Sequence, residues 1–163
     1  MAEPISVSID IDAPAEKIYA LVADLPSMGK WSPEATGGKW LDGATSAKPG
    51  VRFRGTNRNG VFRWSTVCTI TAAEPGRTIE WVTTAIGFLD GALWRYEFAP
   101  NGTGGTTVTE LTEDRRGRLL RWTAPVTVGV KDRAGHNRRS MQATLERLKA
   151  AAEGDHRGED AVR

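Results

Sequence analysis

The sequence is poor in the residues that build disulfides and metal sites. Of its 163 residues, one is cysteine and two are histidine. The single Cys68 has no partner for an intrachain disulfide and cannot supply a cysteine-based zinc site. We therefore expect no metal and no other cofactor. A Cys68 that points into an apolar interior is expected to be an inert thiol.

Long apolar runs and a strong charge bias are also missing. No segment approaches the roughly 18 consecutive apolar residues that a membrane span requires. The opening segment MAEPISVSID lacks the basic and apolar parts of a signal peptide. Lys and Arg number 22 against 20 Asp and Glu, a net charge of only +2, which gives no general attraction to nucleic acid. We expect a cytoplasmic protein that neither spans a membrane nor binds nucleic acid.

One basic cluster departs from this even balance. Arg115, Arg116, Arg118 and Arg121 lie close together just before the C-terminal helical pattern. Such charge runs commonly solvate a protein face. The cluster nevertheless leaves open a regulatory or interaction protein that meets an acidic partner through a basic rim.

The N-terminal segment combines a strand pattern with two short helical patterns. Residues 5–12 alternate apolar and polar side chains, which predicts a half-buried strand. A helix is expected to follow, with Asp12 or Ala13 at the cap and Pro14 in the first turn. It ends near Pro26, and a second short helix is expected around residues 27–31.

Residues 39–114 consist of strand patterns separated by turn signals. Asn59-Gly60 predicts a two-residue type I′ hairpin turn, which has positive φ at both central positions. Further turns are expected at Pro75-Gly76, Asp90-Gly91 and Asn101-Gly102. Short connections join antiparallel neighbours. We therefore predict a meander of about six strands, joined by the N-terminal strand to give a sheet of about seven.

The C-terminal part has the periodicity of one long amphipathic helix. At 100° per residue, one arc of about 100° collects Val126, Val130, Ala134, Asn137, Met141, Leu145 and Leu148. The helix is expected to begin near Thr123 or Ala124. We predict one domain over residues 1–152 and a disordered tail over residues 153–163.

Two polar residues of this helix carry separate expectations. Asn137 lies inside the apolar arc, where its amide must find a hydrogen-bond partner in the sheet, a water or a ligand. His136 lies at the border of the arc, and we expect it to make a surface hydrogen bond.

The order of these elements resembles the START/Bet v 1-like superfamily, specifically its bacterial polyketide cyclase/dehydrase-like branch. The resemblance covers residues 3–152. It is carried by the segments IDIDAPAEKIYALVAD at 9–24, WSP at 31–33, TITAAEPGRTIEW at 69–81, WRYEF at 94–98 and DRAGHNRRSMQATLERL at 132–148. It implies an α+β helix-grip fold, in which an antiparallel sheet wraps a long C-terminal helix.

A helix-grip fold implies that any volume left between sheet and helix becomes an apolar cavity. Strand and helix periodicity supply candidate lining residues, which are Phe53, Phe62, Trp64, Thr66, Trp81, Trp94, Tyr96, Val130, Asn137 and Met141. The indoles of Trp64, Trp81 and Trp94 can form an aromatic wall, although core filling explains them equally well. The Tyr96 hydroxyl can orient a ligand carbonyl or bond to ordinary backbone.

The orientation of Glu110 decides how much chemistry such a cavity can perform. If Val108 faces inward, strand alternation places Glu110 inward too, where burial suits a carboxyl group to acid or base work. If Leu111 faces inward instead, Glu110 is solvated, and we favour this second arrangement.

Three functions follow from these expectations. The leading one is binding or transport of a small hydrophobic molecule, lipid or polyketide-like, in the internal cavity. The first alternative is an aromatase/cyclase-like enzyme in which Tyr96, Glu110 and Asn137 assist proton transfer. The second alternative is the interaction protein with a basic surface.

Overall fold

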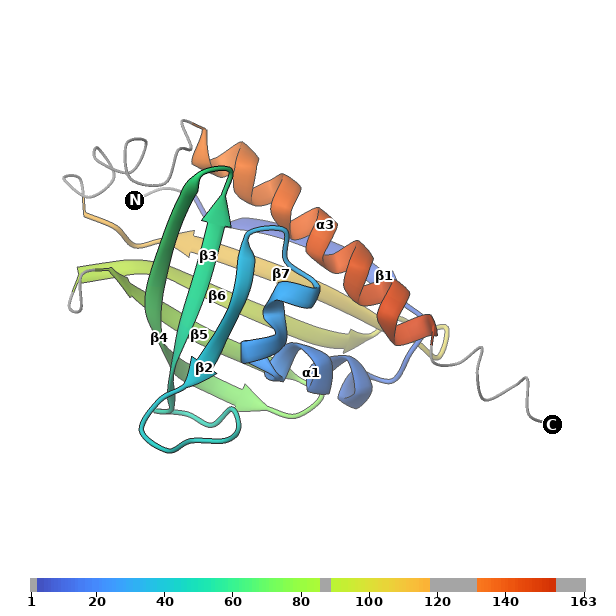
Figure 1. Cartoon of the computed structure of the whole chain (residues 1–163). Coiled ribbons are helices and arrows are strands. Elements are labelled where there is room, and N and C mark those ends of the chain that lie inside the picture. The colour runs from blue at the N-terminus through green and yellow to red at the C-terminus, as the bar shows by residue number, and fades with distance from the viewer. Residues whose placement is uncertain (1–2, 86–88, 118–131, 155–163) are drawn as a thin grey trace.

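The computed structural model of the chain describes residues 3–85, 89–117 and 132–154. Within these ranges, seven antiparallel strands form one curved sheet (Figure 1). The strands are β1 (Ile5–Ile11), β2 (Ala35–Trp40), β3 (Arg52–Asn59), β4 (Phe62–Glu74), β5 (Thr78–Ala85), β6 (Leu89–Pro100) and β7 (Thr106–Asp114). Their spatial order is β1-β7-β6-β5-β4-β3-β2. The predicted six-stranded meander, closed on one side by the N-terminal strand, is confirmed.

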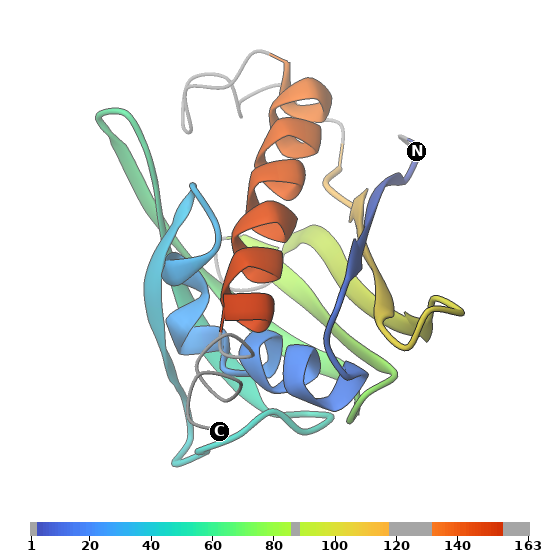
Figure 2. The same cartoon turned by 90° about the vertical axis from the view of Figure 1, so that its right-hand side faces the viewer.

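Three helices lie on the concave side of this sheet in the described ranges. Helix α1 (Ala15–Ala23) and the 3₁₀ helix η1 (Leu25–Lys30) connect β1 to β2, and the long helix α3 (Arg133–Gly154) crosses the sheet. In Figure 2, the C-terminal end of α3 approaches α1. The helix-grip fold is therefore confirmed. No helix among the described residues combines the length and the apolarity needed to cross a bilayer.

Helix α3 begins later than the sequence pattern predicts. The Asp132 side chain accepts a hydrogen bond from the Gly135 N–H at 3.0 Å, and its carbonyl accepts one from the His136 N–H at 3.0 Å. Asp132 therefore precedes the first helical residue, Arg133, as an N-cap does. A continuous helix from Thr123 or Ala124 is wrong, and those two residues lie outside the described ranges.

The ends of other elements also differ from expectation. Helix α1 has Pro14 at its N-cap in an extended conformation, in place of Asp12 or Ala13. The hairpin between β3 and β4 pairs Asn59 with Phe62, so its central residues are Gly60 and Val61. Of these two, Gly60 alone has positive φ, at 59°, as in a type II′ turn. Helix α3 reaches Gly154, two residues into the predicted tail, and residues 155–163 lie outside the described ranges.

The core of the protein lies beneath the C-terminal half of α3. The buried residues of this helix are Met141, Thr144, Leu145, Leu148 and Ala152. Leu145 and Leu148 are both 0% exposed and pack in a cluster with α1, η1 and strand residues, among them Ile18, Leu25 and Val108. From Leu145 onward, the helix therefore contributes to the core and not to the cavity.

Replacing Leu145 by alanine tests this packing. Loss of a fully buried leucine side chain removes transfer free energy and leaves a cavity, so we expect Leu145→Ala to lower the free energy of unfolding by about 2–5 kcal/mol. Urea denaturation followed by far-UV circular dichroism measures the change. Gln142→Ala, at an exposed position one turn earlier, should stay within about 0.5 kcal/mol of the wild type. Equal effects of the two substitutions would contradict the assignment of the core.

Candidate ligand-binding site

A cavity of about 320 Å³ lies between the sheet and the N-terminal half of α3. It is lined by η1 and by residues of all seven strands, with five α3 positions, Arg133 among them, facing the strands. The volume lies at the lower end of the range of small-molecule pockets, about 300–1,000 Å³. The unfilled space that the helix-grip fold implies is therefore present.

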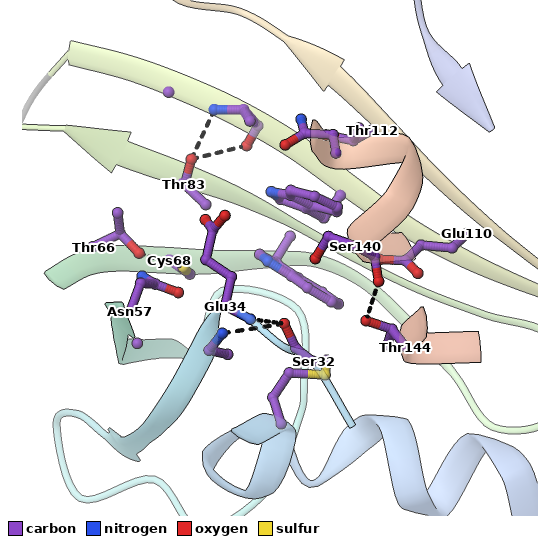
Figure 3. A pocket seen from close by; sticks show the side chains of 18 of the residues that line it. Ser32, Glu34, Asn57, Thr66, Cys68, Thr83, Glu110, Thr112, Ser140 and Thr144 are labelled. Carbon is purple, nitrogen blue, oxygen red and sulfur yellow. Dashed lines mark hydrogen bonds between the residues drawn. The ribbon is translucent and has the colours of Figure 1, made fainter. Parts of the chain in front are cut away.

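The cavity exists because the inward face of α3 changes character along the helix. The part of the helix up to Thr144 presents Ala134, Asn137, Ser140 and Thr144 to the cavity, whereas Leu145, Leu148 and Ala152 beyond it are buried in the core. The Thr144 hydroxyl donates to the Ser140 carbonyl at 2.8 Å (Figure 3). These small and polar side chains cannot reach the sheet, so the space beneath them stays open. Ser140 and Thr144 were not predicted, although their helical spacing from Asn137 points to the same face.

The sheet side of the cavity carries the predicted aromatic wall. Trp64, Trp81 and Trp94 all line the cavity. The rings of Trp81 and Tyr96 are stacked, with centroids 5.9 Å apart and an interplanar angle of 19°. The predicted lining residues that the structure brings together are Phe53, Trp64, Thr66, Trp81, Trp94, Tyr96 and Asn137.

Three predicted lining residues are not part of this set. Phe62 is 38% exposed beside the β3–β4 hairpin, where β4 extends past the space that α3 covers. Met141 is 1% exposed but does not line the cavity. Val130 lies outside the described residues.

An irregular pairing of β5 with β6 shapes one end of the cavity. The register shifts between Val82 and Thr84, and the Thr83 side chain enters the break. The Thr83 hydroxyl accepts from the Ala92 N–H at 2.7 Å and donates to the Ala92 carbonyl at 3.2 Å (Figure 3). Gly91 is required here, because a Cβ at this position would collide with the Thr83 hydroxyl and backbone.

Glu110 faces the cavity, contrary to the arrangement that we favoured. Strand β7 buries Thr106, Val108, Glu110 and Thr112, whereas Leu111 lies on the opposite, partly exposed face. Glu110 is 4% exposed and is paired directly across the sheet with Tyr96. The inward threonines are satisfied by backbone carbonyls, as the Thr112 hydroxyl donates to Leu93 at 3.1 Å.

Burial governs the acidity of this pair. It raises the pKa of the Glu110 carboxyl group to about 8, an effect that the hydrogen bond from Tyr96 offsets only in part. The pKa of Tyr96 is raised well above its ordinary value, first by burial and then by the Glu110 charge and hydrogen bond. At neutral pH both side chains are therefore mainly uncharged, in a cavity with an apolar and aromatic wall.

Cys68 lines the cavity as an unreactive thiol. It is 3% exposed, and burial raises its pKa to about 12 despite a weak contact of 3.8 Å with the Thr66 hydroxyl. The thiolate needed for nucleophilic attack is thus disfavoured. Within the described ranges, His, Cys, Asp and Glu side chains form no group of three or more that suits a metal ion.

An ion pair between Glu34 and Arg133 joins the two sides of the cavity rim. Glu34, which precedes β2, accepts hydrogen bonds from Arg133 at 2.8 Å and contacts the Nε2 of His136 at 2.7 Å. Glu34 and Arg133 both line the cavity. Sequence reasoning missed Glu34, because 99 residues separate it from Arg133. The surface hydrogen bond expected of His136 is therefore a partly buried contact with this carboxylate.

The predicted basic rim is largely neutralised where it is described. Arg116 forms a bidentate pair with Asp114, at 2.8 and 2.7 Å, and both residues line the cavity. Arg115 lies 3.5 Å from Glu113. Arg118 and Arg121 lie outside the described residues.

A curved sheet that grips a long helix over a partly apolar cavity defines a class of ligand-binding folds. Residues 4–153 match the family model described as "Polyketide cyclase / dehydrase and lipid transport". The chain belongs to this family, and the resemblance inferred from its sequence segments is confirmed. No curated protein matches the sequence.

Solved structures share the fold at low sequence identity. DR_A0006 from Deinococcus radiodurans is 21% identical, with a TM-score of 0.67, and the match covers 93% of this chain and 99% of that one. Ara h 8.0201 is 11% identical with a TM-score of 0.66, covering 93% and 98%. The di-domain ARO/CYC StfQ from the steffimycin biosynthetic pathway is 15% identical with a TM-score of 0.70, covering 94% of this chain and 51% of StfQ. At these identities the likeness establishes the fold alone.

The raised pKa of Glu110 predicts a specific dependence of stability on pH. Between about pH 4.5 and pH 8 the folded protein retains a proton that the unfolded chain has released. Rising pH therefore favours unfolding, by at most about 1.4 kcal/mol per pH unit from this group. Above pH 8 both states are ionised, and this contribution becomes constant.

The substitution Glu110→Gln should remove this contribution. We expect its free energy of unfolding, measured by urea titration at several pH values, to rise relative to the wild type as pH increases through this window. Glu97→Gln changes a carboxylate on the exposed face of β6, whose side chain is 55% exposed, and should run parallel to the wild type. If the free energy of unfolding of Glu110→Gln varies with pH as that of the wild type does, the burial of an ionisable Glu110 is contradicted.

Proposed function

We propose that this protein binds a small, mainly hydrophobic molecule, lipid or polyketide-like, in the cavity between α3 and the sheet. The observation that carries the proposal is the cavity of about 320 Å³ with its aromatic wall. Transfer of apolar surface from water into such a space is favourable without any specific contact. The family description, which includes lipid transport, agrees with this function.

Tryptophan fluorescence offers a direct test. Because three indoles line the cavity, an occupant should change their emission. We expect at least one member of a panel of fatty acids, sterols and aromatic polyketides to quench the fluorescence saturably. A panel that leaves the emission unchanged would contradict the proposal.

A cavity-filling substitution makes the test specific. A Cβ at Gly55 would lie 3.7 Å from both Phe53 and the Thr66 hydroxyl, which is ordinary contact. We expect Gly55→Leu to fold, to occupy part of the cavity and to weaken binding of the quenching ligand about tenfold or more. Arg54→Leu, on the exposed face of the same strand, should leave binding unchanged. Equal binding by both variants would place the ligand elsewhere.

The position of Glu110 favours a second candidate, an aromatase/cyclase-like enzyme. A buried carboxyl group with a pKa of about 8, bonded to Tyr96, is suited to exchange protons near neutral pH. StfQ, which shares the fold, is a di-domain ARO/CYC. In this function the cavity would hold a carbonyl-rich chain in a folded pose, with Asn137 as a further polar contact.

Turnover separates the two candidates. A carrier returns its ligand unchanged, whereas an enzyme converts a linear polyketide chain into a cyclised product that mass spectrometry and ultraviolet absorbance detect. If the protein is such an enzyme, Glu110→Gln should slow product formation by about a hundredfold or more. Recovery of unchanged substrate would contradict the enzymatic function and leave ligand binding as the proposed function. A cytoplasmic location and the absence of nucleic-acid binding stay predictions.

A further inference from the structure

The Glu110 carboxyl group leaves one hydrogen-bonding position unused. Its Oε2 atom is buried, and no hydrogen bond to it is present in the described part of the chain. The Tyr96 hydroxyl lies close enough to influence the pKa of this carboxyl group. Buried polar atoms without a partner are rare, and each one in a native structure requires an explanation.

The elements around Glu110 do not supply the missing partner. Across the sheet, Glu110 faces Val7 of β1 and Tyr96 of β6. Helix α3 brings Asn137, Ser140 and Thr144 to the same cavity. The Thr144 hydroxyl is engaged with the Ser140 backbone carbonyl (Figure 3). The charged groups that line this cavity besides Glu110 are Glu3, Glu34, Asp114, Arg116 and Arg133. The last four form the carboxylate–guanidinium pairs of the rim.

We propose that Glu110 donates a hydrogen bond from Oε2 to a carbonyl oxygen of the bound ligand, so that the cavity selects aromatic ketones over hydrocarbons of the same shape. The inference rests on the ligand-binding function proposed above and specifies its ligand class. Tyr96 is the direct cross-strand partner of Glu110 and lines the same cavity. The stacked Trp81 and Tyr96 rings provide the flat surface that an aromatic ring system contacts.

The choice of a carbonyl group follows from what the site needs. A protonated carboxyl group has one O–H to donate, and a ketone oxygen is an acceptor without a charge. An anionic ligand group would have to leave water for a mainly apolar cavity, which is costly. A hydrocarbon would fill the same space but leave the carboxyl group unpaired.

Fluorenone and fluorene are a matched pair of probes, because both have flat fused-ring skeletons and one carries a carbonyl group. We expect the wild type to bind fluorenone about fivefold or more tightly than fluorene at about pH 7, by calorimetry or fluorescence. The carbonyl stretching band of bound fluorenone should move to lower wavenumber, as it does when a ketone accepts a hydrogen bond. At about pH 9.5, where Glu110 has lost its proton, both effects should vanish.

Two substitutions at Glu110 separate the effect of hydrogen-bond donation from the effect of how well the probe fits the cavity. Glu110→Gln keeps an N–H donor that does not titrate, so its preference for fluorenone should persist at both pH values. Glu110→Met has no donor and should bind the two probes equally at both. If Glu110→Met fails to fold, the contrast between the wild type and Glu110→Gln still decides the matter.

Groups other than Glu110 are also tested as causes of the expected pH dependence. Burial holds the pKa of Cys68 at about 12 and raises that of Tyr96, so neither thiol nor phenol changes in this range. Glu97→Gln controls for an exposed carboxylate on β6 and should follow the wild type. Tyr96→Phe removes the donor that favours the carboxylate and should move the loss of preference to higher pH.

The outcomes distinguish this inference from the function on which it rests. Equal binding of both probes by the wild type at about pH 7 would overturn the carbonyl contact and leave the hydrophobic cavity intact. A preference that survives in Glu110→Met, or that is independent of pH in the wild type, would also overturn it. If neither probe binds, and the panel of apolar ligands fails as well, the proposed binding function falls together with the contact.

Discussion

Helix α3 presents two different surfaces to the sheet along a single face. Leu145 and Leu148 in its second half reach the sheet and build the core, whereas Asn137 and Ser140 in its first half are too short to do so. The same element therefore supplies both stability and the cavity. Large apolar side chains at the first-half positions would give a solid interior, because protein cores close up to crystal-like packing density wherever side-chain volume permits.

The Glu110–Tyr96 pair acquires its properties from this division. A carboxyl group on a sheet surface exposed to water would ionise and be solvated, but beneath α3 it is enclosed by strands and aromatic rings. The penalty of burying its charge keeps it protonated near neutral pH. The charged pairs of the rim, Glu34 with Arg133 and Asp114 with Arg116, stay where water can still reach them. The polarity of the cavity is thus graded from its rim to its interior.

Much of the fold could be predicted because strand alternation and helical periodicity are local properties of the sequence. The orientation of β7 could not, since its threonines fit either face and Val108 competes with Leu111 for the interior. The decision rests on distant backbone carbonyls, such as that of Ala13, which accepts from Thr106 at 2.8 Å. The Glu34–Arg133 contact was likewise invisible, because it joins residues that only the folded chain brings together. The aromatic wall could be predicted, because strand alternation places Trp81 and Trp94 on the inner face.

The pairing of β1 with β7 joins the first strand of the sheet to the last. Ile5 lies opposite Thr112, and Val7 lies opposite Glu110. During synthesis, β1 leaves the ribosome about a hundred residues before its partner and must wait with its apolar side uncovered, since such long-range contacts form slowly. The wall that contains Glu110 is therefore among the last parts of the molecule to be assembled, and a nascent chain halted before β7 holds neither the complete sheet nor a binding site.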